Sequence, residues 1–79
     1  MIMAVFRMKT LNDVKIGETV KVVSVRGEGM LKNRLMDMGI TKGTEMTVKK
    51  RAPFGDPIEV AVRGYELAIS KVIAEMIVV

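Results

Sequence analysis

Residues 44–64 read TEMTVKKRAPFGDPIEVAVRG, and this stretch decides the fold. In its first half Met46 and Val48 alternate with polar residues. Its second half alternates in the same way from Ile58 to Val62. An apolar residue at every second position predicts a β-strand that buries one face. The prolines and glycine between the two halves are typical of a turn. The stretch therefore predicts a β-hairpin.

Further strands are predicted on both sides of this hairpin. The segment ETVKVVSVRG, residues 18–27, is rich in valine, but its apolar residues change face between Val22 and Val23. Such a change is expected for a strand that bends or bulges between two packed faces. After the hairpin, YELAIS at 65–70 predicts a shorter strand, and EMIVV at 75–79 predicts a final one.

One α-helix is predicted, in MLKNRLMDMGI at residues 30–40. Leu31, Leu35 and Met38 are spaced i, i+4 and i+7, which places them along one apolar stripe. Gly39 follows the last residue of the stripe and is expected to end the helix in a left-handed conformation. Turns elsewhere are marked by three further glycines, Gly43, Gly55 and Gly64.

Two helical turns are also predicted. Thr10 precedes a short turn, and Asp13 stands three residues later, in the spacing of a capping box. Ser70 can cap a second turn in KVIA, residues 71–74.

Together these elements predict an all-β protein, a small SH3-like β-barrel. It contains one short α-helix between the first two strands and one or two helical turns. We expect residues 1–79 to form a single domain. Residues 1–10 either form an extra strand or remain loose.

Composition excludes much catalytic chemistry. The 79 residues include no Cys and no His. Disulfides and ordinary zinc or soft-metal sites therefore cannot form. The serines have no His to act as a base, and the carboxylates are spread singly along the chain. We expect no enzyme, no catalytic residues, no metal site and no cofactor.

Charge and hydropathy indicate a cytoplasmic protein. Thirteen Lys and Arg oppose nine Asp and Glu, giving a net charge of +4. No apolar run is long enough to span a bilayer, and the start of the chain lacks the features of a signal peptide. The segment KIGETVKVVSVRGEG also resembles KOW-type nucleic-acid-binding modules, with Lys49 to Arg51 as a basic run. Few aromatic residues are available for base stacking, so we expect no nucleic-acid partner.

Several motifs, in this order, carry a family resemblance: LNDVKIGETVKVVSV, RLMDMGI, KGTE, RAPFGDPIEV and RGYELAI. From Leu11 to Val79 the chain resembles ferrous iron transport protein A (FeoA). The resemblance implies an SH3-like barrel that acts in the cytosol beside the membrane GTPase permease, ferrous iron transport protein B (FeoB). It leaves three mechanisms open: docking on the permease, modulation of its GTPase, and metal sensing.

Partner-binding residues are sought among apolar residues in otherwise polar positions. Phe54 either folds back over the core or projects as an anchor. Met36 and Met30 lie off the helix stripe and either contact a partner or are covered by strands. We hypothesise that Met36 and Phe54 share one docking surface with a basic rim of Arg34 and Arg51. The high apolar fraction also suggests a patch that self-associates or meets a partner.

Overall fold

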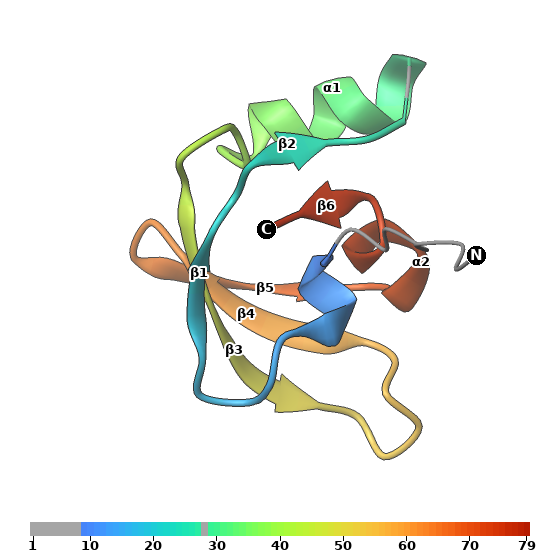
Figure 1. Ribbon diagram of the computed structural model, residues 1–79. Helices are drawn as coiled ribbons and strands as arrows, with labels where there is room; N and C mark the ends of the chain where they lie inside the picture. The colour runs from blue at the N-terminus through green and yellow to red at the C-terminus, as the bar shows by residue number, and fades with distance from the viewer. Residues whose placement is uncertain (1–8, 28) are drawn as a thin grey trace, which may run out of the picture.

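The computed structural model describes residues 9–27 and 29–79. The expectation for residues 1–10 therefore lies mostly outside the described residues. In chain order the elements are η1 (Leu11–Asp13), β1 (Thr19–Lys21), β2 (Ser24–Val25), α1 (Gly29–Asp37), β3 (Glu45–Arg51), β4 (Ile58–Val62), β5 (Tyr65–Ile69), α2 (Lys71–Ala74) and β6 (Ile77–Val78) (Figure 1).

The predicted hairpin forms the middle of a four-stranded antiparallel sheet with strand order β1-β3-β4-β5. Met46 pairs with Val62 and Val48 with Val60, and all four side chains are buried. The register then shifts between Val48 and Lys50, so one extra residue bulges from β3. The alternation predicted from the sequence is confirmed up to this bulge.

The predicted first strand is divided between two sheets. The side chain of Val22 is 2% exposed and that of Val23 is 53% exposed, which confirms the change of face. Before this point β1 pairs with β3, and after it β2 pairs with β6 in a second sheet. The sequence predicted one strand where the structure has two, β1 and β2. The helix α1 therefore follows β2 and precedes β3.

The two sheets enclose an aliphatic core. Its members come from β3, β4, β5 and β6, from η1, α1 and α2, and from the loops between elements, and are Leu11, Val14, Val22, Leu35, Ile40, Met46, Val48, Ile58, Val60, Val62, Ile69, Ala74 and Ile77. Burying large aliphatic side chains is the main driving force for folding a domain of this size. The SH3-like, mostly β class predicted from the sequence is confirmed by this arrangement.

Both predicted helical turns are present. The backbone N–H of Thr10 donates to the carboxylate of Asp13 at 3.0 Å, which is one half of a capping box. The hydroxyl of Ser70 accepts from the N–H of Ile73 at 3.3 Å at the start of α2.

The C-terminal end of α1 is closed by a glycine cap. Gly39 has a φ of +88°, and its N–H donates to the carbonyl of Met36 at 2.9 Å. The N–H of Ile40 donates to the carbonyl of Leu35 at 3.0 Å. These two bonds define a Schellman motif, in which the chain reverses and brings the next apolar residue back against the helix. Leu35 and Ile40 are accordingly both buried.

Two side chains, Arg63 from the β4–β5 turn and Tyr65 from the start of β5, hold this cap against the barrel. The Nε of Arg63 donates to the carbonyl of Gly39 at 3.1 Å. The hydroxyl of Tyr65 donates to the carbonyl of Met38. Among the described side chains of α1, only that of Leu35 is buried. The helix is therefore fixed mainly at its C-terminal end.

Candidate docking surface

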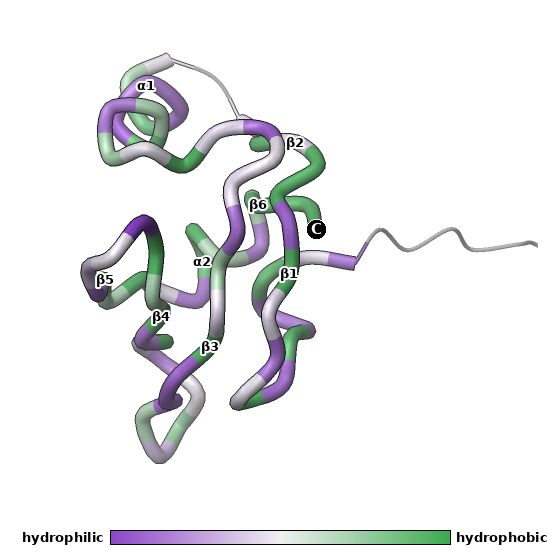
Figure 2. The backbone as a smooth tube through the Cα atoms, turned by 90° about the vertical axis from the view of Figure 1, so that its left-hand side faces the viewer, coloured by the Kyte–Doolittle hydropathy of each residue, from purple (hydrophilic) through white to green (hydrophobic). Residues whose placement is uncertain are grey.

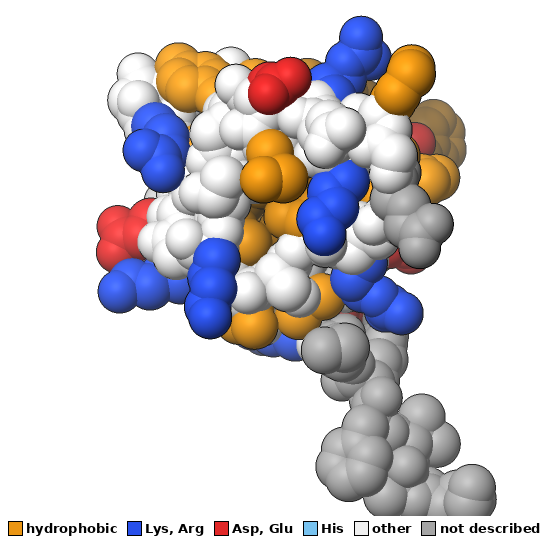
Figure 3. All heavy atoms as spheres, turned by 90° about the horizontal axis from the view of Figure 1, so that it is seen from above, with side chains coloured by type: hydrophobic (Ala, Val, Ile, Leu, Met, Phe, Trp, Pro, Cys, Tyr) orange, Lys and Arg blue, Asp and Glu red, His pale blue; other side chains and the backbone are white. Residues whose placement is uncertain are grey.

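An apolar groove separates α1 from β2. Its volume is about 240 Å³, and the described residues that line it are Val23, Ser24, Val25, Lys32, Met36, Ile40, Thr41 and Lys42. Met36 is 48% exposed and Val23 is 53% exposed, one on each side of the groove. Figure 3 shows this side of the molecule, where hydrophobic side chains lie among Lys and Arg. We call these eight residues the α1–β2 groove.

The charges of the α1–β2 groove have one sign. Lys32 lies one helical turn before Met36, and Lys42 lies in the turn after the helix cap. Among the described residues that line the groove, none is Asp or Glu. An apolar floor with a polar rim is the usual composition of a protein-binding surface.

The opposite side of α1 forms a second hollow, with a volume of about 510 Å³. Met30, which is 86% exposed, and Arg34 both line it, and Asp37 brings a negative charge. The structure therefore places Met30 and Arg34 together, but on a different side of the helix from the α1–β2 groove.

Phe54 lies far from this helix. Its side chain is 95% exposed at the tip of the β3–β4 hairpin, so of the two predicted orientations it projects into solvent. Figures 1 and 2 both place the hairpin tip at one end of the barrel and α1 at the other. The two residues hypothesised to share one surface, Met36 and Phe54, are not brought together.

Arg51 has an internal role. Its Nη2 donates to the carbonyls of Asn12 and Val14, each at 2.7 Å, and its side chain is half-buried. The bulge in β3 explains this position, because Arg51 pairs with Ile58, whose side chain faces the core. Without the bulge, strict alternation from Met46 would have placed Lys50, and not Arg51, on the core side of β3. The structure thus places Arg51 against η1 and away from Arg34.

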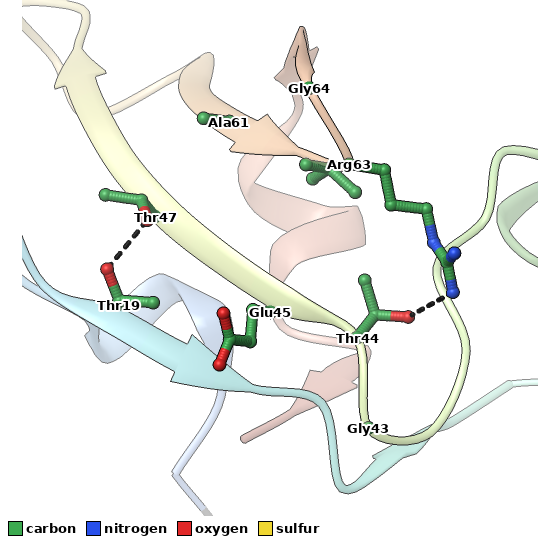
Figure 4. A pocket seen from close by; sticks show the side chains of 9 residues that line it. Thr19, Gly43, Thr44, Glu45, Thr47, Ala61, Arg63 and Gly64 are labelled. Atoms are coloured by element: carbon green, nitrogen blue, oxygen red, sulfur yellow. Dashed lines mark hydrogen bonds between the residues drawn. The ribbon is translucent and has the colours of Figure 1, made fainter.

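A third hollow, of about 470 Å³, lies over β1, β3 and the β4–β5 turn (Figure 4). It is polar, and no pattern in the sequence indicated it. The hydroxyls of Thr19 and Thr47 are 2.7 Å apart, and Nη2 of Arg63 lies 3.4 Å from the hydroxyl of Thr44. The polar side chains that line this hollow thus largely hydrogen-bond to one another.

The four predicted turn glycines all lie in turns. Each has a positive φ, between 80° and 88°. Gly64 follows Arg63, which also has a positive φ of 48°, in the two-residue turn between β4 and β5. Positive φ at both central residues is characteristic of a type I′ hairpin.

Within residues 9–27 and 29–79 no group of three or more His, Cys, Asp or Glu side chains could hold a metal ion. No helix formed by these residues has the length and apolar character needed to cross a bilayer.

Outside the groove, the carboxyl of Glu18 has a shifted pKa. Its carboxylate accepts from the backbone N–H of Lys15 at 2.8 Å and lies 3.9 Å from the ammonium of Lys9. The hydrogen bond from Lys15, and then the charge of Lys9, lower the pKa of Glu18 below its ordinary value.

The barrel, its helix and its caps define a small SH3-like protein. FeoA of Stenotrophomonas maltophilia, solved with zinc and described as a prokaryotic SH3 domain protein, is similar: the two chains are 26% identical, with a TM-score of 0.78 over 89% of this chain and 87% of that one. The FeoA-like protein of Clostridium acetobutylicum is 39% identical, with a TM-score of 0.82 over 94% of this chain and 86% of that one.

Sequence comparison identifies the family. The FeoA domain family matches residues 9–79, so the chain belongs to the FeoA family, and the resemblance noted in the sequence is confirmed. A fusion protein of Fe(2+) transport protein A and the Fe(2+) transporter FeoB from Porphyromonas gingivalis is 29% identical over 61 residues, or 77% of this chain. The match covers 7% of that much longer protein.

Proposed function

We propose that this chain is a cytosolic accessory protein of ferrous iron uptake that docks on the cytosolic part of a FeoB permease. The observation that carries the proposal is the fusion relative, in which an FeoA part and a FeoB part share one chain. Joining two partners raises their effective concentration, which favours contact between them. Where FeoA and FeoB are separate chains, FeoA needs a surface that binds FeoB with sufficient affinity to make the same contact.

The α1–β2 groove supports such a docking role. It combines exposed apolar side chains, Val23 and Met36, with two lining lysines, Lys32 and Lys42. Met is well suited to contacts with a partner, because its unbranched side chain adapts to the opposing surface. In this proposal the chain has no catalytic activity of its own, and its effect on uptake comes from binding.

The proposal is tested by titrating the protein into the cytosolic GTPase domain of its own permease, with binding and GTP turnover recorded together. We expect binding, and a fall in affinity of at least about tenfold for Met36→Asp, which places a charge in an apolar contact. Val72→Asp is the matched control, because Val72 is 67% exposed on α2 and does not line the groove.

The outcomes separate the possible mechanisms. Binding with altered GTP turnover indicates modulation of the GTPase, whereas binding with unaltered turnover indicates docking alone. Equal affinities for Met36→Asp and Val72→Asp would contradict docking through the groove. Phe54→Ala in the same titration reports whether the distant hairpin tip makes a separate contact. If neither the GTPase domain nor the intact permease binds, the proposed function is wrong.

A further inference from the structure

We propose that the α1–β2 groove binds an amphipathic helix of a partner protein, with apolar anchor residues flanked by Asp or Glu. This inference rests on the proposed docking function and specifies the chemistry of the segment that docks. It follows from the size of the groove, the charge around it and the short length of the strand that forms one wall.

The size of the groove favours side-chain anchors. Its volume of about 240 Å³ lies below the range of roughly 300–1,000 Å³ that is typical of small-molecule sites. Its apolar lining comes from Val23, Val25, Met36 and Ile40. A space of this size and composition fits one or two apolar side chains of a peptide segment rather than a cofactor.

Charge determines what surrounds those anchors. Lys32 and Lys42 are both exposed and both line the groove, and the described lining residues include no carboxylate. Complementary charge across an interface guides association and selects the partner. An anchor flanked by Asp or Glu would meet the ammonium groups of Lys32 and Lys42, whereas one flanked by Lys or Arg would be repelled.

The shape of the walls favours a helix over an added strand. Strand addition needs a row of unpaired backbone groups along an edge. Here β2 contains only Ser24 and Val25, which is shorter than the roughly three to ten residues of ordinary strands. One wall is the exposed face of α1 that carries Lys32 and Met36. Helix-in-groove recognition, with two anchors at i and i+4, suits such a site.

The test uses two designed peptides and no permease. Each is about 18 residues long, because much shorter helices are marginal in water, and carries Leu at i and i+4. One carries Glu beside the leucines and the other carries Lys at the same positions. Binding of each to the intact, isotope-labelled protein is followed by NMR at low salt. We expect the acidic peptide to shift the amide signals of Val23, Met36 and Thr41.

We expect the acidic peptide to bind at least about tenfold more tightly than the basic one, because two exposed charge pairs change from attractive to repulsive. Lys32→Glu with Lys42→Glu should reverse this order. Lys49→Glu with Lys50→Glu is the matched control, since it changes the net charge equally at exposed positions that do not line the groove. This control should preserve the preference for the acidic peptide.

Several results would overturn the inference: no binding of either peptide, equal affinities, a control variant that acts like the groove variant, or shifts confined to residues outside the groove. Concentration-dependent dimerisation that Met36→Asp abolishes would assign the groove to a second copy of the chain and would also overturn it.

The two proposals can fail separately. Permease binding without acidic-peptide binding would refute the further inference and retain the docking function. Acidic-peptide binding without permease binding would retain the groove chemistry and refute FeoB as the partner.

Discussion

Replacing Gly39 by alanine tests how the cap of α1 is held. Gly39 and Gly43 share a φ of +88°, so alanine would be strained at both positions. Their surroundings differ. A Cβ on Gly39 would lie 3.0 Å from Cδ and 3.2 Å from Nε of Arg63, whereas a Cβ on Gly43 would meet no atom of the described residues within 4 Å. Gly43→Ala is therefore a matched control for the backbone contribution.

The difference between the two variants can be estimated. A non-glycine residue in the left-handed region costs about 1–2 kcal/mol at either position. At Gly39 the side chain of Arg63 must also shift, which weakens its hydrogen bonds to the carbonyl of Gly39 at 3.1 Å and to the hydroxyl of Thr44 at 3.4 Å. Because Arg63 is exposed, we take the lower part of the usual range for these bonds, about 1 kcal/mol in total. We thus expect a loss of about 2–3 kcal/mol for Gly39→Ala.

Thermal denaturation followed by circular dichroism would measure the effect. In a domain of this size 1 kcal/mol corresponds to roughly 4–8 °C in Tm, so Gly39→Ala should melt about that much lower than Gly43→Ala. In an Arg63→Ala background the extra loss at Gly39 should disappear, because the displaced side chain is already absent. Equal losses at the two glycines, or an extra loss that persists without Arg63, would refute the reasoning.

Three further predictions concern other parts of the chain. Arg51→Lys should lower the free energy of unfolding by about 1.5–3 kcal/mol in urea denaturation, because the shorter ammonium lacks the planar guanidinium whose Nη2 bonds two carbonyls while Nη1 bonds Oδ1 of Asn12; an unchanged midpoint would contradict this. Phe54→Ala should alter stability by no more than about 0.5 kcal/mol, since its ring is 95% exposed, and a larger loss would indicate a structural role. In an NMR titration Glu18 should show a pKa below its ordinary value, mainly because of the N–H of Lys15. A lowered folded-state pKa stabilises the fold above the unfolded-state pKa, and this contribution is lost as pH falls through the folded-state pKa. Glu18→Gln should therefore reduce the pH dependence of stability in acid; an unshifted Glu18 signal would contradict the assignment.

Local patterns predicted the elements because neighbouring residues determine them. The alternation in β4 requires only that one face be buried, and the Gly39 cap requires only a helix followed by glycine and an apolar residue. The change of face at Val22 and Val23 likewise located the bend between β1 and β2. Which sheet each half joins depends on pairing with β3 and β6, and the sequence pattern carries no signal for that choice.

The candidate site was less predictable because it depends on long-range geometry. Phe54 and Met36 both stood out as apolar residues in polar positions, but the fold puts the β3–β4 hairpin tip and α1, which carry them, at opposite ends of the barrel (Figures 1 and 2). Arg51 was misplaced for a more local reason. The bulge between Val48 and Lys50 moves it to the core side of β3, and a run of three cations gives no sign of where such a bulge falls.

The attachment of α1 has a consequence for how partner affinity could vary among related proteins. Because Arg63 and Tyr65 hold the helix by its C-terminal end, they set the position of the wall that carries Met36. Neither residue lines the α1–β2 groove. A substitution of Arg63 or Tyr65 would therefore shift this wall without altering any residue that lines the groove. Under the proposed docking function, recognition can thus be adjusted from outside the interface, and a comparison restricted to groove residues would miss the change.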